Sequence, residues 1–146
     1  MTEKFLAPNA FERVFNRAFG FFVGLGLAPA HMFLLEVRGR KSGKIYRTPV
    51  DLLQYRGKQW LVAPRGRTQW VRNAEAAGEI VLKRGSQRRA YRLRPVPAAD
   101  RPPYLKAYLD RFKTEVQRYF SVAAGSPPEA FAPVAEDYPV FELIAA

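Results

Sequence analysis

The chain contains no cysteine and only one histidine, His31, and each shortage excludes some chemistry. Without cysteine there can be no disulfides, thiolate metal sites or cysteine nucleophiles, which suits a reducing cytoplasm. A single histidine argues against a histidine-rich metal site and against a Ser-His-Asp triad. Because His31 lies in an apolar run beside Pro29, we interpret it as a structural residue and predict no metal site.

The sequence also has little that could span a membrane. Residues Ala18 to Leu35 carry no formal charge and just reach the length of a span. Glycines, a proline and a histidine interrupt this run, which favours a helix packed on the core or lying at a membrane surface. No signal peptide is evident. We therefore expect a cytoplasmic protein, and peripheral contact with the cytoplasmic face of a membrane remains an open alternative.

Acidic residues are scarce relative to basic ones, so the 146-residue chain has a formal net charge of +11. The excess is concentrated between Arg38 and Arg94, which contain 16 Lys and Arg residues against 3 Asp and Glu. Such a field attracts an anion, which could be nucleic acid, anionic lipid or a small ligand with phosphates and carboxylates. The length indicates one domain with its own core.

Apolar periodicity predicts an α+β fold. Residues 1–30 hold helically spaced apolar positions from Phe11 to Phe22, which predict an amphipathic helix followed by an apolar connection. Residues 33–94 should form the main strands and residues 98–146 the C-terminal helices, beginning after a cap at Asp100, and a last strand. The result would be a small, partly open barrel of about six mostly antiparallel strands. The predicted strands are Phe33–Arg38, Ile45–Gln54, Gln59–Ala63, Glu79–Lys83, Gln87–Arg94 and Val140–Ile144, with a crossing helix at Trp70–Ala77 capped by Thr68.

The most distinctive stretch is the turn Val37-Arg38-Gly39-Arg40-Lys41-Ser42-Gly43-Lys44. Exposed N–H groups at glycines, one hydroxyl and clustered cations suit a phosphate or another oxyanion. The spacing is neither that of a P-loop nor that of a dinucleotide fingerprint. The loop from Ala63 to Trp70 repeats this chemistry before a helix N-terminus. Together the two loops predict a site for a ligand with an aromatic ring and an anionic tail, in which Arg40, Lys41, Arg65 and Arg67 hold the charge. The alternative is a basic hairpin with a solvated face.

These segments, taken as a set, resemble the deazaflavin-dependent nitroreductase family. The resemblance covers roughly residues 10 to 144 and is densest from Leu34 to Val81. It implies a split β-barrel similar to the FMN-binding split barrels, with coenzyme F-420 as the cofactor. This coenzyme is an 8-hydroxy-5-deazaflavin with a phosphodiester and a polyglutamate tail. The implied reaction is hydride transfer from the reduced coenzyme to a quinone, an enone or a nitroaromatic acceptor. The segments that carry the resemblance are Leu34 to Lys44, Arg47-Thr48-Pro49-Val50, Leu61 to Gly66 and Trp70-Val71-Arg72-Asn73.

The resemblance also implies roles for individual residues. Asp51 stands where better-studied members of the family often carry a tyrosine, so the choice of acceptor is expected to differ. No catalytic residue is assigned, and the candidate proton donors are ordered water or one of Tyr104, Tyr108, Tyr119 and Tyr138. The implied cofactor-binding residues are Arg40, Lys41 and Ser42 for the phosphate and tail, Pro49, Val50 and Asp51 along the ring, Ala63, Pro64, Arg65 and Gly66 beside it, and Trp70 and Asn73 closing the site.

Two further hypotheses remain open from the residues. The first is a non-catalytic split barrel that binds a flavin, haem or the deazaflavin, with FMN or FAD as the alternative cofactor. The second is a nucleic-acid-binding barrel, which rests on charge alone because aromatic residues do not alternate with the cations. We expect a small-molecule acceptor and no nucleic acid as partners, and a homodimer as the assembly.

Overall fold

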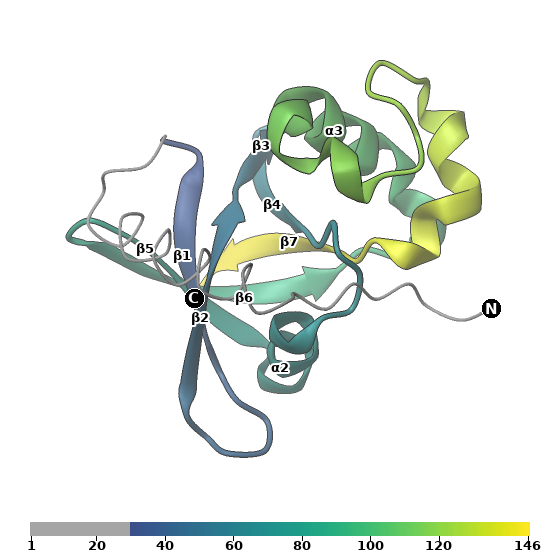
Figure 1. Cartoon of the computed structure of the whole chain (residues 1–146). Helices are drawn as coiled ribbons and strands as arrows, with labels where there is room; N and C mark the ends of the chain where they lie inside the picture. Colours follow the sequence, from purple (N-terminus) through teal and green to yellow (C-terminus); the bar gives the residue numbers. More distant parts are fainter. Residues whose placement is uncertain (1–29) are drawn as a thin grey trace.

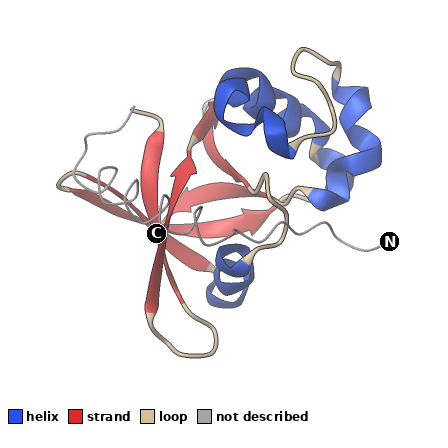
Figure 2. Cartoon of the chain, in the orientation of Figure 1, coloured by secondary structure: helices blue, strands red, loops and turns tan. Residues whose placement is uncertain are grey.

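The computed structural model describes residues 30–146, which form a curled seven-stranded sheet with helices packed against it (Figures 1 and 2). The helix predicted between Phe11 and Phe22 lies outside the described residues. Between residues 30 and 146, no helix is both long and apolar enough to cross a membrane. The strands are β1 Met32–Arg38, β2 Ile45–Asp51, β3 Leu53–Tyr55, β4 Lys58–Val62, β5 Glu79–Arg84, β6 Gln87–Pro95 and β7 Val140–Ala145. The helices are α2 Gln69–Ala77 and α3 Pro102–Val116, with 3-10 segments η1 Ala98–Asp100, η2 Gln117–Tyr119 and η3 Pro128–Asp137.

The sheet is curled because its two edge strands are consecutive in the chain. The strand order is β2-β1-β5-β6-β7-β4-β3, and every neighbouring pair is antiparallel. Only Leu52 separates β2 from β3, and one residue spans at most about 3.6 Å. The two edges therefore meet at Leu52, whose N–H donates to the His31 carbonyl at 2.8 Å. The single strand predicted over Ile45–Gln54 is wrong, because the chain leaves one edge at Asp51 and enters the other at Leu53.

Side chains of alternating polarity divide the sheet into two faces. Leu35 of β1 lies opposite Leu82 of β5, and both are buried in the interior of the curl. Glu36, the next residue along β1, instead forms ion pairs with Arg47 and Arg88. This period of two is the strand signature, and it explains how a chain with so many cations still encloses an apolar core. That interior cluster also includes Val37, Leu52, Leu61, Ala74, Ile80, Tyr91 and Leu143.

Helix α3 covers the end of the sheet where β3 and β4 lie (Figure 1). Its apolar face packs into a second core cluster, which Phe120 joins from beyond the end of the helix; the buried residues of the helix are Leu105, Tyr108, Leu109, Phe112 and Val116. The prediction that Asp100 caps this helix is wrong. Asp100 belongs to η1, and the residue before α3 is Arg101, which donates to the carbonyls of Val96 and Ala135.

The end of α3 shapes the candidate site. Phe112 has non-helical backbone angles (φ −113°, ψ 26°), so the helix is kinked there. After the kink, Glu115 in the last turn of α3 lies at a cavity beside β2, and η2 brings Arg118 and Tyr119 to the same cavity.

Candidate active site

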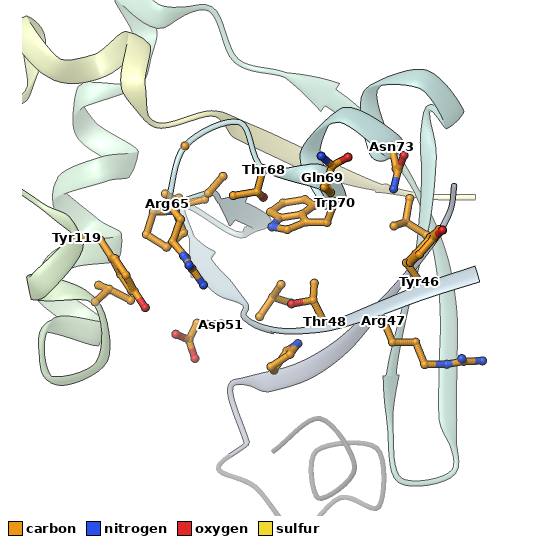
Figure 3. Close-up of a pocket in the computed structure, with 18 of the residues that line it drawn as sticks. Tyr46, Arg47, Thr48, Asp51, Arg65, Thr68, Gln69, Trp70, Asn73 and Tyr119 are labelled. Atoms are coloured by element: carbon orange, nitrogen blue, oxygen red, sulfur yellow. The ribbon is translucent and has the colours of Figure 1, made fainter. Parts of the chain in front are cut away.

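One cavity of about 1080 Å³ collects side chains from three parts of the chain (Figure 3). The first part is the basic turn and β2, the second is the segment from Val62 to Asn73, and the third is the end of α3 with η2. The cavity is elongated, since Tyr46 and Asn73 lie towards one end and Arg65, Asp51 and Tyr119 towards the other, with Trp70 and Thr48 between them (Figure 3). Every predicted cofactor-binding residue lines it: Arg40, Lys41, Ser42, Pro49, Val50, Asp51, Ala63, Pro64, Arg65, Gly66, Trp70 and Asn73.

The basic turn is tight and requires its glycines. The Gly39 N–H donates to the Lys44 carbonyl at 2.7 Å, and the Gly43 N–H donates to the Gly39 carbonyl at 3.0 Å. Gly43 has a φ of 74°, in the left-handed region that favours glycine. A Cβ on Gly39 would lie 2.5 Å from the Tyr46 ring. The turn is thus held in one shape by its own backbone and by the ring packed on it.

Arg40 and Asn73 join this turn to α2. The buried Asn73 Oδ1 accepts hydrogen bonds from the Arg40 N–H at 3.0 Å and from its Nη1 at 2.7 Å. Arg40 Nη1 also donates to Gln69 Oε1 at 3.0 Å. The guanidinium therefore has a structural role beyond its charge, since it fixes the distance between two elements that line the cavity.

The turn offers fewer free donors than its sequence predicts. The N–H groups of Gly39, Arg40 and Gly43 are used within the protein, and the Lys44 N–H donates to Ser42 Oγ at 3.2 Å. Lys41 is exposed at the cavity and makes no hydrogen bond or ion pair with any residue between 30 and 146. The Ser42 hydroxyl lies 3.2 Å from the Tyr46 hydroxyl. Lys41 and Ser42 are consequently the groups of this turn best placed to meet an anion.

The prediction that Arg67 holds ligand charge is wrong. Its Nε donates to Glu75 Oε1 at 2.8 Å, and its side chain lines a different hollow. The error arises because α2 turns Glu75 towards the preceding loop, a contact eight residues away that composition does not reveal.

The wall of the cavity beside α2 combines apolar surface with one orphaned polar atom. Gly66 has a φ of 84°, and its N–H donates to the Ala63 carbonyl at 3.2 Å, which bends the loop after β4. Thr68 precedes α2 as predicted, but its side chain makes no capping bond. Its Oγ1 is buried, and no residue of the described part of the chain hydrogen-bonds to it. Trp70 packs on Phe141 at 6.2 Å between ring centroids. A buried hydroxyl without a partner beside a cavity is available to a ligand.

Two arginines flank Tyr119 at the other end. The Arg65 guanidinium carbon lies 5.6 Å from the centre of the Tyr119 ring and that of Arg118 lies 4.7 Å from it. Arg118 Nη2 also donates to the Tyr119 hydroxyl at 2.6 Å. Sequence reasoning named Tyr119 only as a candidate proton donor and did not single out Arg118, because the kink that turns this segment to the cavity leaves no sequence signal.

A cluster of three titratable groups, His31, Asp51 and Glu115, lies at the same end. His31 Nε2 is 3.4 Å from Asp51 Oδ1 and 3.4 Å from Glu115 Oε1. Burial, the Glu115 charge and a hydrogen bond to Glu115 raise the pKa of Asp51 from 3.8 to about 7. Burial above all, followed by the charges of Asp51, Glu115 and Tyr119, also raises the pKa of Tyr108 well above 10. Sequence reasoning gave His31 a structural role and passed over Glu115, because 84 positions separate them in the chain.

Comparisons with known proteins identify the family of the chain. A family model described as F420H(2)-dependent quinone reductase matches residues 11–124. No curated protein sequence matches the chain.

Among solved structures, one described as an F420-H2 dependent reductase (FDR-A) is similar, with 20% sequence identity and a TM-score of 0.51. The alignment covers 78% of this chain and 94% of the reductase chain. A structure described as a domain-swapped dimer has 20% identity and a TM-score of 0.55, with coverages of 91% and 92%. The haem storage protein HutZ from Vibrio cholerae has 10% identity and a TM-score of 0.55, with coverages of 81% and 83%. At these identities the structures support the split-barrel fold alone.

Proposed function

The chain belongs to the F420H(2)-dependent quinone reductase family, and from this premise we propose that its cavity holds the coenzyme lengthwise and reduces a quinone at the Asp51 end. The family is one of oxidoreductases that use coenzyme F-420. The elongated cavity, with Lys41 and Ser42 at the end formed by the turn and the Asp51 carboxyl at the other end, is the observation that carries the proposed orientation.

The residues of the cavity fit this coenzyme. Its tail carries a phosphodiester and carboxylates, and Lys41 and Ser42 present a cation and a hydroxyl at the mouth. Pro49, Val50 and Trp70 provide the apolar walls that a flat ring requires. The orphaned Thr68 Oγ1 is a hydrogen-bonding group that the fold leaves for a ligand.

Each group of residues would then have a distinct task. Lys41 and Ser42 would bind the tail, while Arg40, tied to Asn73, would hold the turn at a fixed distance from α2. The loop from Ala63 to Gly66 would lie along the ring, with the Arg65 cation close to it. When bound in its reduced form, the coenzyme supplies a hydride. The protein contributes orientation, exclusion of water and charge.

The acceptor would enter at the end bounded by Asp51 and Tyr119. The family name makes a quinone the first choice, and an enone or a nitroaromatic compound is the second. The Arg65 and Arg118 cations beside the Tyr119 ring place positive charge at this end, which would attract the electron-rich oxygens of a quinone.

The experiment that tests this function follows oxidation of the reduced coenzyme by a soluble quinone, with reduced FMN and FAD as alternative donors. We expect catalytic turnover with the deazaflavin and none with either flavin. Preference for a flavin, or binding of the deazaflavin without turnover, would favour the carrier hypothesis instead.

Assembly and location are also proposals. A homodimer is supported by the similar fold described as a domain-swapped dimer, and analytical ultracentrifugation would detect it. Peripheral membrane contact of a cytoplasmic protein is proposed from the apolar residues 18–29, since the end of the uncharged run, from Met32 to Leu35, belongs to β1. Flotation of the full chain with liposomes, compared with Phe19→Ser, would detect that contact.

A further inference from the structure

We propose that Asp51 is the acid that protonates the quinone oxygen, and that His31 and Glu115 are positioning residues that hold its proton and replace it from solvent. This inference rests on the proposed function and extends it, because the family resemblance assigns no proton donor.

The geometry of the cluster connects the cavity to solvent. Asp51 is 8% exposed and Glu115 is 38% exposed, and both line the cavity, whereas His31 is 24% exposed and is not among the lining residues. The Asp51 carboxyl lies between Tyr119 and Thr48 (Figure 3). The His31 imidazole contacts the Phe112 ring at 4.8 Å between centroids, and its Nε2 lies equally close to both carboxyl groups. Proton-exchanging groups therefore run from solvent to the cavity wall.

The hydrogen-bonding capacity of the cluster is not used up by the fold. Asp51 Oδ1 and His31 Nε2 are both buried atoms that no residue between 30 and 146 hydrogen-bonds. Their separation of 3.4 Å is long for a hydrogen bond. Catalytic hydrogen bonds are commonly long before a ligand binds and shorten in the complex. A purely structural cluster would be expected to pair these atoms already.

Asp51 is also unlike the other buried acids of the described chain. Glu36 is paired with Arg47 and Arg88, and Glu142 is paired with Arg94 and Lys58. Asp51 faces His31 and Glu115 instead, and no Lys or Arg of the described residues pairs with it. The hydrogen bond from Arg94 thus lowers the pKa of Glu142, whereas burial first, and then the charge of Glu115, raises the pKa of Asp51.

The surroundings of Asp51 contain several further titratable or charged groups. Tyr108 and Glu115 face it from α3, and Arg118 and Tyr119 line the cavity from η2. Arg65 lies on the loop after β4 and is stacked on Tyr119. Tyr108 is a poor acid at neutral pH because its pKa is raised well above 10. With a pKa of about 7, Asp51 keeps its proton in a substantial fraction of molecules and can still release it.

The reaction balances with one proton from Asp51. The quinone gains one proton and two electrons as a hydride supplied by the reduced coenzyme, and one of its oxygens becomes an anion. An O–H bond then forms at that oxygen while the O–H bond of the Asp51 carboxyl breaks. The carboxylate that remains takes a proton from solvent through His31 or Glu115, and a neutral hydroquinone leaves.

The first test is made on the coenzyme-free protein. The carboxyl carbon of Asp51 is followed by NMR as a function of pH in the wild-type chain and in Glu115→Gln. We expect a titration midpoint near neutrality that moves to lower pH in Glu115→Gln, because the variant removes a negative charge. A midpoint near the ordinary value for aspartate in both proteins would overturn the inference.

The second test compares Asp51→Asn with wild type on two quinones in single turnovers. For a quinone whose hydroquinone is a weak acid, we expect the rate of reduction to fall about 100-fold, as is typical when a general acid is lost. For an electron-poor quinone whose hydroquinone anion is stable in water, we expect less than about a threefold fall, since no acid is needed. Asp110→Asn is the matched control, because Asp110 is exposed on α3 outside the cavity and is paired with Lys106.

Each outcome separates this inference from the proposed function. Equal losses on both quinones, or no loss on either, would overturn the role of Asp51 while leaving the reductase in place. Loss of activity on treatment with a chelator, restored by a divalent metal, would assign the cluster to a metal ion instead and would also overturn it. A wild-type protein that oxidises no reduced coenzyme would contradict the proposed function, whereas the NMR titration would still report on the cluster.

Discussion

At the scale of single residues, the unusual feature is a buried carboxyl group whose environment opposes its charge. The other two buried acids between residues 30 and 146, Glu36 and Glu142, each form ion pairs with two cations on the outer face of the sheet. Asp51 has a carboxylate and an imidazole for neighbours. Folded proteins tolerate such an arrangement at functional sites, where a perturbed pKa has a use.

The raised pKa of Asp51 predicts how stability depends on pH. Between about pH 4 and pH 7 the folded protein keeps this proton while the unfolded chain loses it, so stability falls as pH rises. Asp51→Asn, which cannot ionise, should match wild type near pH 4. It should be more stable by up to about 4 kcal/mol above pH 7.

Chemical denaturation at several pH values measures this difference. Glu79→Gln is the control because Glu79 is exposed, and its stability relative to wild type should change little across the same range. A stability difference for Asp51→Asn that does not grow with pH would contradict the raised pKa.

At the scale of elements, the site depends on how the basic turn is fastened to α2. The turn is held to α2 by two hydrogen bonds from Arg40 to Asn73. The sequence predicted that both residues belong to the site, but it did not predict that they are hydrogen-bonded to each other. Because Asn73 is 5% exposed, its loss would leave the Arg40 N–H without its partner in a poorly hydrated place.

Asn73→Ala should therefore loosen the turn. We expect a loss of about 1–2 kcal/mol in stability and a corresponding 5- to 30-fold weakening of coenzyme binding, because the Lys41 cation is no longer held in place. Titration calorimetry and amide hydrogen exchange at Arg40 would report the two effects. Gln69→Ala removes only an exposed bond to the same guanidinium and should change affinity by a factor of about two. An Asn73→Ala variant with wild-type exchange at Arg40 would show that the fastening is unimportant.

Sequence patterns predicted the elements better than their ends. The alternation in β1, β5 and β6 and the apolar face of α3 are local patterns, and the structure contains both. The break at Leu52, the pairing of Arg67 with Glu75 and the kink at Phe112 depend on contacts made only after folding. The cluster of His31, Asp51 and Glu115 is the extreme case, because the hairpin of β1 and β2 brings the first two together and the distant helix α3 supplies the third.

At the scale of the whole molecule, the curl of the sheet produces the site. The two edges of the sheet meet at Leu52, and β2 therefore lies beside the loop after β4. Helix α3 closes one end of the cavity between β2 and this loop. The split-barrel fold was predictable because the motifs resemble a known family, and the family match confirms that prediction. Much of the basic excess between Arg38 and Arg94 serves the fold, through pairs such as Arg47 with Glu36 and Arg94 with Glu142. The part of the charge that meets a ligand is therefore smaller than the total suggests.

The central claim, that the cavity binds coenzyme F-420 with its anionic tail at the basic turn, can be tested by one fluorescence titration. The dissociation constants of the full coenzyme and of the same chromophore without its tail are measured for wild type, Lys41→Ala and Lys44→Ala. Lys44 belongs to the same turn but does not line the cavity, so it is the matched control. We expect wild type to bind the full coenzyme more tightly than the tailless chromophore. The ratio of the two dissociation constants should fall about tenfold in Lys41→Ala and should change little in Lys44→Ala. Equal affinity of wild type for the two ligands, or a preference that Lys41→Ala leaves unchanged, would contradict the claim.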